Sequence, residues 1–314
     1  MKTKRNYLWL YPLINVFLIL CICGYQKENL FTATIIPYAT INGNNIVGDI
    51  NKADEIGIPI NFISGDCGTI MEKPEANNID RIAVKLDSPQ RTVTDVDGNV
   101  YQTVLIGERE WMAENLKTTK YNDSTPITTG LSDLDWRNNT SGAYTIYPHD
   151  DVRGINSESD MLAAYGALYN WYASENDNLC PDGWHIPSDE EWTELTDYIA
   201  SVNSINIGNQ LKSCRQDGSP LGGKCADSQH PRWNSHKLHH GIDKFGFAAL
   251  PGGIRHNNGT FSLIGSYANW WSATEGTAAY AWSMRSGFDS GDVFRFLNNK
   301  ACGLSVRCVR RGVE

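Results

Sequence analysis

The first 23 residues constrain this chain most, because they indicate the compartment in which the rest of it folds. Lys2, Lys4 and Arg5 form a basic start, and residues 7–23 are almost wholly apolar. A basic start, an apolar run and then polar chain are typical of an export signal. The alternative is an uncleaved anchor, although the run is at the short end of the ~17–25 residues that span a membrane. In either case the sequence predicts that the remaining chain lies outside the cytoplasm, where disulfides can form.

Two cysteines, Cys21 and Cys23, close the apolar run. This arrangement resembles the lipobox of bacterial lipoproteins, in which a cysteine at the end of the run is acylated. Leu20 and the small Cys21, three and two positions before Cys23, favour Cys23 as the acylated residue. The resemblance implies a stable lipid anchor and a membrane as partner. The alternative is that both cysteines are ordinary residues of the signal.

The other six cysteines are an even number, as expected for a disulfide framework in an exported chain. They are Cys67, Cys180, Cys214, Cys225, Cys302 and Cys308. Cys214 and Cys225 close a short loop and form a natural local pair, while the spacing leaves the other pairings open. The sequence has no CxxC pair, so a zinc site is not expected.

The composition excludes two classes of protein. Lys and Arg number 27 against 36 Asp and Glu, which gives a net charge of −9. Nucleic-acid binding selects basic surfaces, so nucleic acid is not an expected partner. Charged residues make up 20% and aromatic residues 11% of the chain, which argues against a mostly disordered protein.

The patterns predict three parts: an export signal at 1–23, a spacer or small β region at 24–90, and one domain at 91–312. In the domain, Asp97-Gly98 stands between two β-rich runs and predicts a hairpin, because both turn positions favour positive φ. A second turn at Gly107 extends the hairpin to a three-stranded meander. The chain from residue 245 onward again has short β-rich runs.

Two helices are expected between these β regions. Residues 157–174 place apolar side chains at helical spacing. The second helix begins after Ser188, which forms an S-x-x-E capping box with Glu191. Trp192, Leu195 and Ile199 then form one apolar stripe. Strands, two helices and strands again predict an α+β domain.

Several segments, in this order, resemble a bacterial family, the Fibrobacter succinogenes major paralogous domain. They are VTDVDGNVY at 93–101, WMAENL at 111–116, YGALYNWY at 165–172, CPDGWHIPS at 180–188, FAALPGG at 247–253, WSAT at 271–274 and SVRCVR at 305–310. The resemblance covers about residues 91–312. It implies an exported protein or lipoprotein of a Gram-negative bacterium, whose molecular function is largely unassigned.

More distantly, IPSDEEW at 186–192 resembles the helix start of formylglycine-generating-type domains, which share the C-type lectin-like fold. That resemblance implies a β-rich domain with two helices, whose two chain ends meet in one sheet. It also implies a disulfide between Cys180 and Cys308. Cys302 is then left for Cys67, or free.

The same resemblance raises an enzyme alternative, a formylglycine-generating-type oxidoreductase that would bind copper through Cys302 and Cys308. The other motif residues of that enzyme are not recognisable here, and a disulfide at Cys308 would leave no thiolate. No G-x-S-x-G elbow and no phosphate-binding loop is present. Acidic pairs such as Asp133 with Asp135 match no EF-hand loop, so a calcium site is unsupported and no cofactor is expected. The histidines at 236, 239 and 240 are interpreted as a surface patch.

The tryptophans in the family motifs (Trp111, Trp184, Trp192 and Trp271) are expected in the core, because each can bury a large area. Others could form a surface that binds a ligand. The candidate ligand-binding residues are Trp233, Arg232, Trp270, Asp289, Asp292 and Arg295.

The leading hypothesis is an exported cell-envelope lipoprotein, placed in the outer membrane of a Gram-negative bacterium. It would carry a non-catalytic module that binds a glycan or protein at the cell surface. The formylglycine-generating-type enzyme and a purely structural envelope protein are the alternatives.

Overall fold

The computed structural model describes residues 40–42, 45–48, 82–85 and 91–311, and the chain divides into two compact units, Met1–Gln90 and Arg91–Glu314. In the first unit, β1 (Thr40–Asn42), β2 (Asn45–Gly48) and β3 (Ile82–Lys85) form one antiparallel sheet. The predicted export signal at 1–23, with Cys23, and Cys67 lie outside the described residues. None of the helices that the structure describes is long and apolar enough to cross a membrane.

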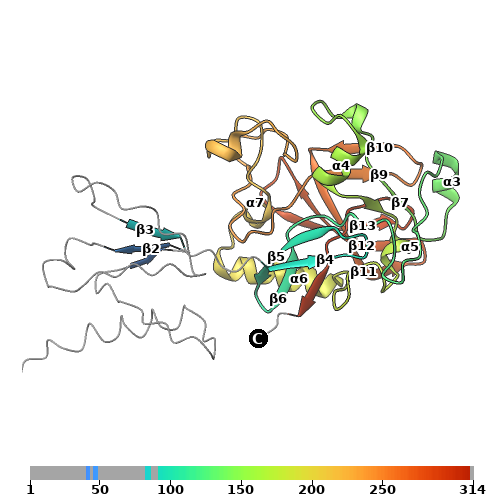
Figure 1. Ribbon diagram of the computed structural model, residues 1–314, viewed down its shortest axis with the longest axis horizontal. Helices are drawn as coiled ribbons and strands as arrows, with labels where there is room; N and C mark the ends of the chain where they lie inside the picture. The colour runs from blue at the N-terminus through green and yellow to red at the C-terminus, as the bar shows by residue number, and fades with distance from the viewer. Residues whose placement is uncertain (1–39, 43–44, 49–81, 86–90, 312–314) are drawn as a thin grey trace, which may run out of the picture. The chain divides into compact units, whose positions relative to one another are not determined.

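The second unit is built mainly from strands (Figure 1). Its strands are β4 (Arg91–Thr94), β5 (Val100–Ile106), β6 (Arg109–Met112), β7 (Tyr144–Thr145), β8 (Leu168–Tyr169), β9 (Gly252–Arg255), β10 (Phe261–Ile264), β11 (Tyr267–Thr277), β12 (Tyr280–Gly287), β13 (Val293–Asn299) and β14 (Val309–Arg311). Its helices are α3 (Asp133–Asn138), α4 (Glu158–Tyr165), α5 (Trp171–Ser174), α6 (Asp189–Val202) and α7 (Ile207–Leu211), with short 3₁₀ turns at His149–Asp151 and Gly223–Ala226.

The expected α+β class and C-type lectin-like fold are wrong. Residues 91–311 form four sheets arranged as a half-barrel, and only α6 among the described helices exceeds eight residues. The helical spacing at 157–174 was misleading, because side chains from Tyr165 to Trp171 are buried on all sides rather than along one stripe. Buried, short apolar runs carry no periodicity that separates helix from strand.

Gly166 ends the first expected helix after two turns. Its φ of 77° is a conformation that other residues rarely adopt. A Cβ atom at this position would lie 2.7 Å from the Cβ of Asn115 and 2.8 Å from the carbonyl of Leu116. The chain therefore turns at Gly166, adds β8 and begins a separate short helix, α5.

The first predicted strands and the second predicted helix are confirmed. β4, β5 and β6 form a meander, and Gly98 in the first turn has positive φ, whereas Asp97 does not. Instead, the Asp95 carboxylate accepts hydrogen bonds from the backbone N–H groups of Asp97 and Asn99. At the start of α6, Ser188 and Glu191 form the reciprocal capping box.

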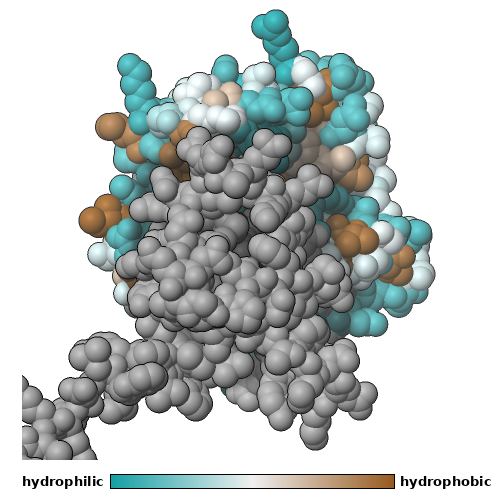
Figure 2. All heavy atoms as spheres, turned by 60° about the vertical axis from the view of Figure 1, so that its left-hand side comes forward, coloured by the Kyte–Doolittle hydropathy of each residue, from teal (hydrophilic) through white to brown (hydrophobic). Residues whose placement is uncertain are grey.

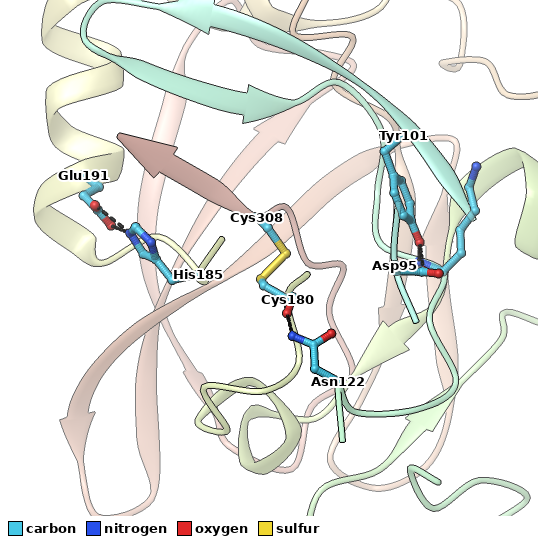
Figure 3. The surroundings of a disulfide bond; sticks show 8 residues. Asp95, Tyr101, Asn122, Cys180, His185, Glu191 and Cys308 are labelled. Carbon is cyan, nitrogen blue, oxygen red and sulfur yellow. Dashed lines mark hydrogen bonds and ion pairs between the residues drawn. A yellow bond between two sulfur atoms is a disulfide. The ribbon is translucent and has the colours of Figure 1, made fainter. Parts of the chain in front are cut away.

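The end of the chain returns to its beginning within this unit. β14 pairs antiparallel with β6, so that the sheet order is β14-β6-β5-β4, and Figure 1 shows the red last strand beside the teal ones. A disulfide between Cys180 and Cys308, one residue before β14, ties this strand to the chain before α6 (Figure 3). The meeting of the ends and this cysteine pair agree with what the resemblance implied.

The long sheet β11-β12-β13 divides the hydrophobic core. Neighbouring residues of a strand point to opposite faces. Trp271 accordingly packs with Trp171 and the Cys180–Cys308 disulfide, while Trp270 packs with Trp111 and with Trp192 of α6. Trp192 lies 4.9 Å from Trp111 and 5.8 Å from Trp270 between ring centroids. Trp111, Trp192 and Trp270 therefore hold the sheet and α6 together.

Candidate functional site

An open groove lies between α4 and the loop at 228–231. Its volume is about 590 Å³, within the roughly 300–1,000 Å³ of pockets that bind small ligands. The lining residues are Gly154, Ile155, Asp160, Ala163, Ala164, Ser228, Gln229, His230 and Pro231. They combine small apolar side chains with a few polar ones.

Helix α4 presents this lining because its two faces differ. The side chain of Ser157 caps the helix by accepting a hydrogen bond from the N–H of Asp160. Met161 and Tyr165 are buried on the inner face, whereas Asp160 and Ala163 are exposed. The small alanines leave room above the helix, and the cap holds the backbone of Asp160 at its first turn.

His230 and Tyr165 hold the opposite wall in place. The Nε2 atom of His230 lies 3.1 Å from the carbonyl oxygen of Arg153, so Nε2 carries the proton and donates it there. The other nitrogen, Nδ1, then accepts a hydrogen bond from the Tyr165 hydroxyl at 2.6 Å. The same hydroxyl accepts from the N–H of Arg232 at 3.1 Å. Both ring nitrogens of His230 are thus engaged within the protein.

The electrostatics of the pair agree with this assignment. Burial lowers the pKa of His230 below its usual value, which favours the neutral ring. Burial also raises the pKa of Tyr165 to about 12, so the hydroxyl keeps its proton. Neither group is free to take a proton from a bound molecule. The groove can therefore recognise a ligand through Asp160, Ser228 and Gln229, but it lacks an available general base of the histidine type.

The structure does not place Trp233 and Trp270 at a surface, and their prediction as surface ligand-binding residues is wrong. Both are 2% exposed. The indole N–H of Trp233 donates to the carbonyl of Ala249 at 3.0 Å, and that of Trp270 donates to Asn115 Oδ1 at 3.0 Å. Each tryptophan can be buried in the core because its indole N–H, the only polar group of the side chain, has a hydrogen-bond acceptor there.

The other four candidate residues lie at or near the surface. The backbone N–H of Arg232 donates to the Tyr165 hydroxyl, and its guanidinium lies 3.6 Å from Asp217. Arg295 is exposed on β13, where it pairs with Asp189 and stacks over Trp282 at 4.3 Å. Asp289 and Asp292 are exposed on the turn between β12 and β13.

A buried lysine, Lys212, stabilises that turn by hydrogen bonds to its backbone. The sequence analysis did not identify it as a structural or functional residue. The ammonium of Lys212 donates to the carbonyls of Gly287 and Ser290, at 2.9 Å and 2.8 Å, and to that of His239 at 2.6 Å. Burial lowers its pKa to about 8. Three carbonyl oxygens satisfy its three donors, so this lysine has a structural role.

The cysteine pair that the enzyme alternative requires does not exist in this structure. Cys308 is bonded to Cys180. Cys302 has no disulfide partner among the described residues, and burial raises its pKa to about 11, which disfavours a thiolate. The second disulfide joins Cys214 to Cys225, as the local spacing predicted. Within residues 91–311, no three His, Cys, Asp or Glu side chains are grouped for a metal ion.

On the face of the molecule drawn in Figure 2, the exposed apolar residues do not indicate a further binding site. On the coloured part of the face drawn in Figure 2, hydrophobic residues form small groups among hydrophilic ones. Scattered groups of this kind are ordinary on protein surfaces and do not mark a site.

The sequence analysis did not predict the groove. Tyr165 and His230, which support it, are 65 positions apart and share no motif.

Comparison with known proteins decides the family. The model of the Fibrobacter succinogenes major domain matches residues 104–310. The chain belongs to this family. No curated protein and no solved structure is detectably similar to it. The match covers nearly all of the second unit, including the groove and both disulfides. Two disulfides are typical of an exported protein.

Proposed function

We propose that this family member is a non-catalytic binding module of the cell envelope, and that its groove between α4 and the loop at 228–231 holds a glycan. The observation that carries the proposal is the groove itself, whose only histidine is engaged at both nitrogens. A site with room for a ligand, whose histidine is held by other groups of the protein, suits recognition without turnover.

The lining favours a glycan over a protein ligand. Asp160, Ser228 and Gln229 are exposed and offer acceptors and donors to hydroxyl groups. Ala163, Ala164 and Pro231 supply small apolar surfaces against which the C–H face of a sugar ring can lie. A groove of this size encloses only a short segment of any protein partner, which would need further contacts outside it.

Filling the groove should weaken glycan binding strongly. Ala163 is exposed and lines the groove, so Ala163→Trp adds bulk there without entering the core. We expect the wild-type protein to bind particular glycans on an array, and we expect Ala163→Trp to reduce that binding at least about tenfold because the ligand loses its space. The control is Ser201→Trp on the exposed face of α6, which should bind as the wild type does.

Two results would contradict the proposal. One is an array on which no glycan binds the wild-type protein. The other is equal binding by the wild type and Ala163→Trp. Capture of a protein ligand that Ala163→Trp abolishes and that no glycan competes would replace the glycan by a protein in the same groove.

We further propose that the module is held at the outer membrane through a lipid on Cys23. The support is the apolar run that this cysteine closes. Full-length wild-type protein expressed in a Gram-negative host should incorporate labelled fatty acid and sediment with the outer membrane. Cys23→Ser should lose both properties, whereas Cys21→Ser should keep them. Acylation of Cys23→Ser to the wild-type level would exclude this anchor.

A further inference from the structure

A second surface of the protein holds an arginine without a counter-ion. It lies on the face of the β11-β12-β13 sheet that carries Asn269, Arg285 and Phe294, which the strand register places side by side. β13 is the outer strand of this sheet, and its residues Phe294 and Phe296 are 42% and 38% exposed. None of these residues lines the groove described above.

The guanidinium of Arg285 is held in one orientation. Its Nε donates to Asn269 Oδ1 at 2.7 Å, and Asn269 is fully buried. The guanidinium carbon lies 4.3 Å from the ring centre of Phe296 and 5.5 Å from that of Tyr267. A hydrogen bond on one side and two aromatic rings therefore fix the plane of the group before any ligand arrives.

The charge of Arg285 is not compensated by the residues around it. Among residues 91–311, no carboxylate forms an ion pair with it, and its two terminal nitrogens make no hydrogen bond to a described residue. Two other arginines of the domain do have a carboxylate partner: Arg295 pairs with Asp189, and Arg255 with Asp133. Partial burial lowers the pKa of Arg285, so the cation has lost water without gaining an anion.

We propose that Arg285, framed by Tyr267, Phe294 and Phe296, binds the carboxylate of an acidic sugar. The two free nitrogens can donate in parallel to the two oxygens of a carboxylate. The exposed faces of Phe294 and Phe296 offer flat apolar surface beside the charge, which suits the C–H face of a uronic acid ring. This site is distinct from the groove and does not depend on its proposed function.

The place of Arg285 in the sheet favours a ligand that lies on the face over a peptide that adds a strand. Arg285 is on the central strand β12, and β13 stands between it and solvent at the edge. A fourth strand paired to β13 would lie two strand spacings, about 9.6 Å, from β12. A carboxylate on such a strand would have to reach back across β13, whereas a sugar resting on Phe296 lies directly against the guanidinium.

Calorimetric titration of the full-length protein with galacturonic acid trimer tests the proposal, and galactose trimer serves as the neutral probe. We expect the acidic trimer to bind at least about tenfold more tightly than the neutral one, and its affinity to fall as salt is raised. Arg285→Gln should weaken binding of the acidic trimer by about tenfold or more, and Arg285→Lys by less, because a lysine keeps the charge but not the paired donors.

Matched variants separate loss of the site from loss of the fold. Arg137→Gln removes an exposed arginine of α3 and should leave binding unchanged. Phe296→Ala should weaken binding even if Arg285→Gln fails to fold. Equal affinity for the acidic and neutral trimers would overturn the proposal, as would unchanged binding by folded Arg285→Gln and Phe296→Ala. Arg285-dependent binding of a glutamate-rich peptide, with none of the acidic trimer, would overturn it in favour of a peptide ligand.

Discussion

Replacing both Cys180 and Cys308 with serine should lower the free energy of unfolding by on the order of 4–5 kcal/mol. The disulfide closes a loop of 128 positions, and a cross-link over so long a loop removes much conformational freedom from the unfolded chain. It also anchors the chain before α6 to the segment that leads into β14, and both cysteines are buried. Equilibrium unfolding in urea, followed by tryptophan fluorescence, measures the change.

The second disulfide provides the matched control. Cys214 and Cys225 are separated by only 11 positions, so replacing both with serine should cost about 2–3 kcal/mol. Both cysteines are partly exposed, and the loop that they close belongs to neither hydrophobic cluster of the sheet. A larger loss from the local pair than from Cys180 and Cys308 would contradict the argument from loop length.

Replacing Arg307 with methionine should destabilise the protein by about 3–5 kcal/mol or prevent it from folding. The side chain is fully buried and donates to the carbonyls of Met112, Phe247 and Ala248 and to Asn115 Oδ1. Its guanidinium also stacks over Phe247 at 4.3 Å. Methionine fills a similar space but removes the guanidinium donors from these oxygen atoms, of which Asn115 Oδ1 keeps the indole N–H of Trp270, and each buried acceptor that loses its donor carries a desolvation cost. Thermal unfolding followed by circular dichroism measures the loss.

Arg311→Met is the control for this prediction, because Arg311 is exposed on β14. It should change the free energy of unfolding by less than about 0.5 kcal/mol. Arg307→Lys should fall between the two, since lysine retains the charge and some of the hydrogen bonds. Equal stability of Arg307→Met and Arg311→Met would show that the buried hydrogen bonds contribute nothing to the fold.

The local features of the fold could be predicted because their determinants are neighbours in the sequence. The capping box at Ser188 needs only Glu191, three residues later. The turn at Gly98 and the Cys214–Cys225 pair likewise depend on residues within a dozen positions. In each case the partner is already close in the unfolded chain.

The fold class could not be predicted in the same way. The buried residues at 165–171 fit one continuous helix as well as they fit a helix, a short strand and a second helix. A contact with a segment distant in the sequence decides between these two arrangements. The backbone at Gly166 approaches Asn115 and Leu116 too closely for a side chain, which ends α4 and allows β8 to form. Such a contact does not appear in any local pattern.

By itself, the sequence determined the family and the turns and caps that adjacent residues build. Only the tertiary structure decided that Trp270 and Trp271 face two separate parts of the core, that Tyr165 meets His230 across 65 positions, and that Arg285 has no acidic partner in the described domain. The physical reason is that burial and charge compensation depend on which distant segments pack together. Both candidate sites, the groove and the surface around Arg285, are formed by such distant segments.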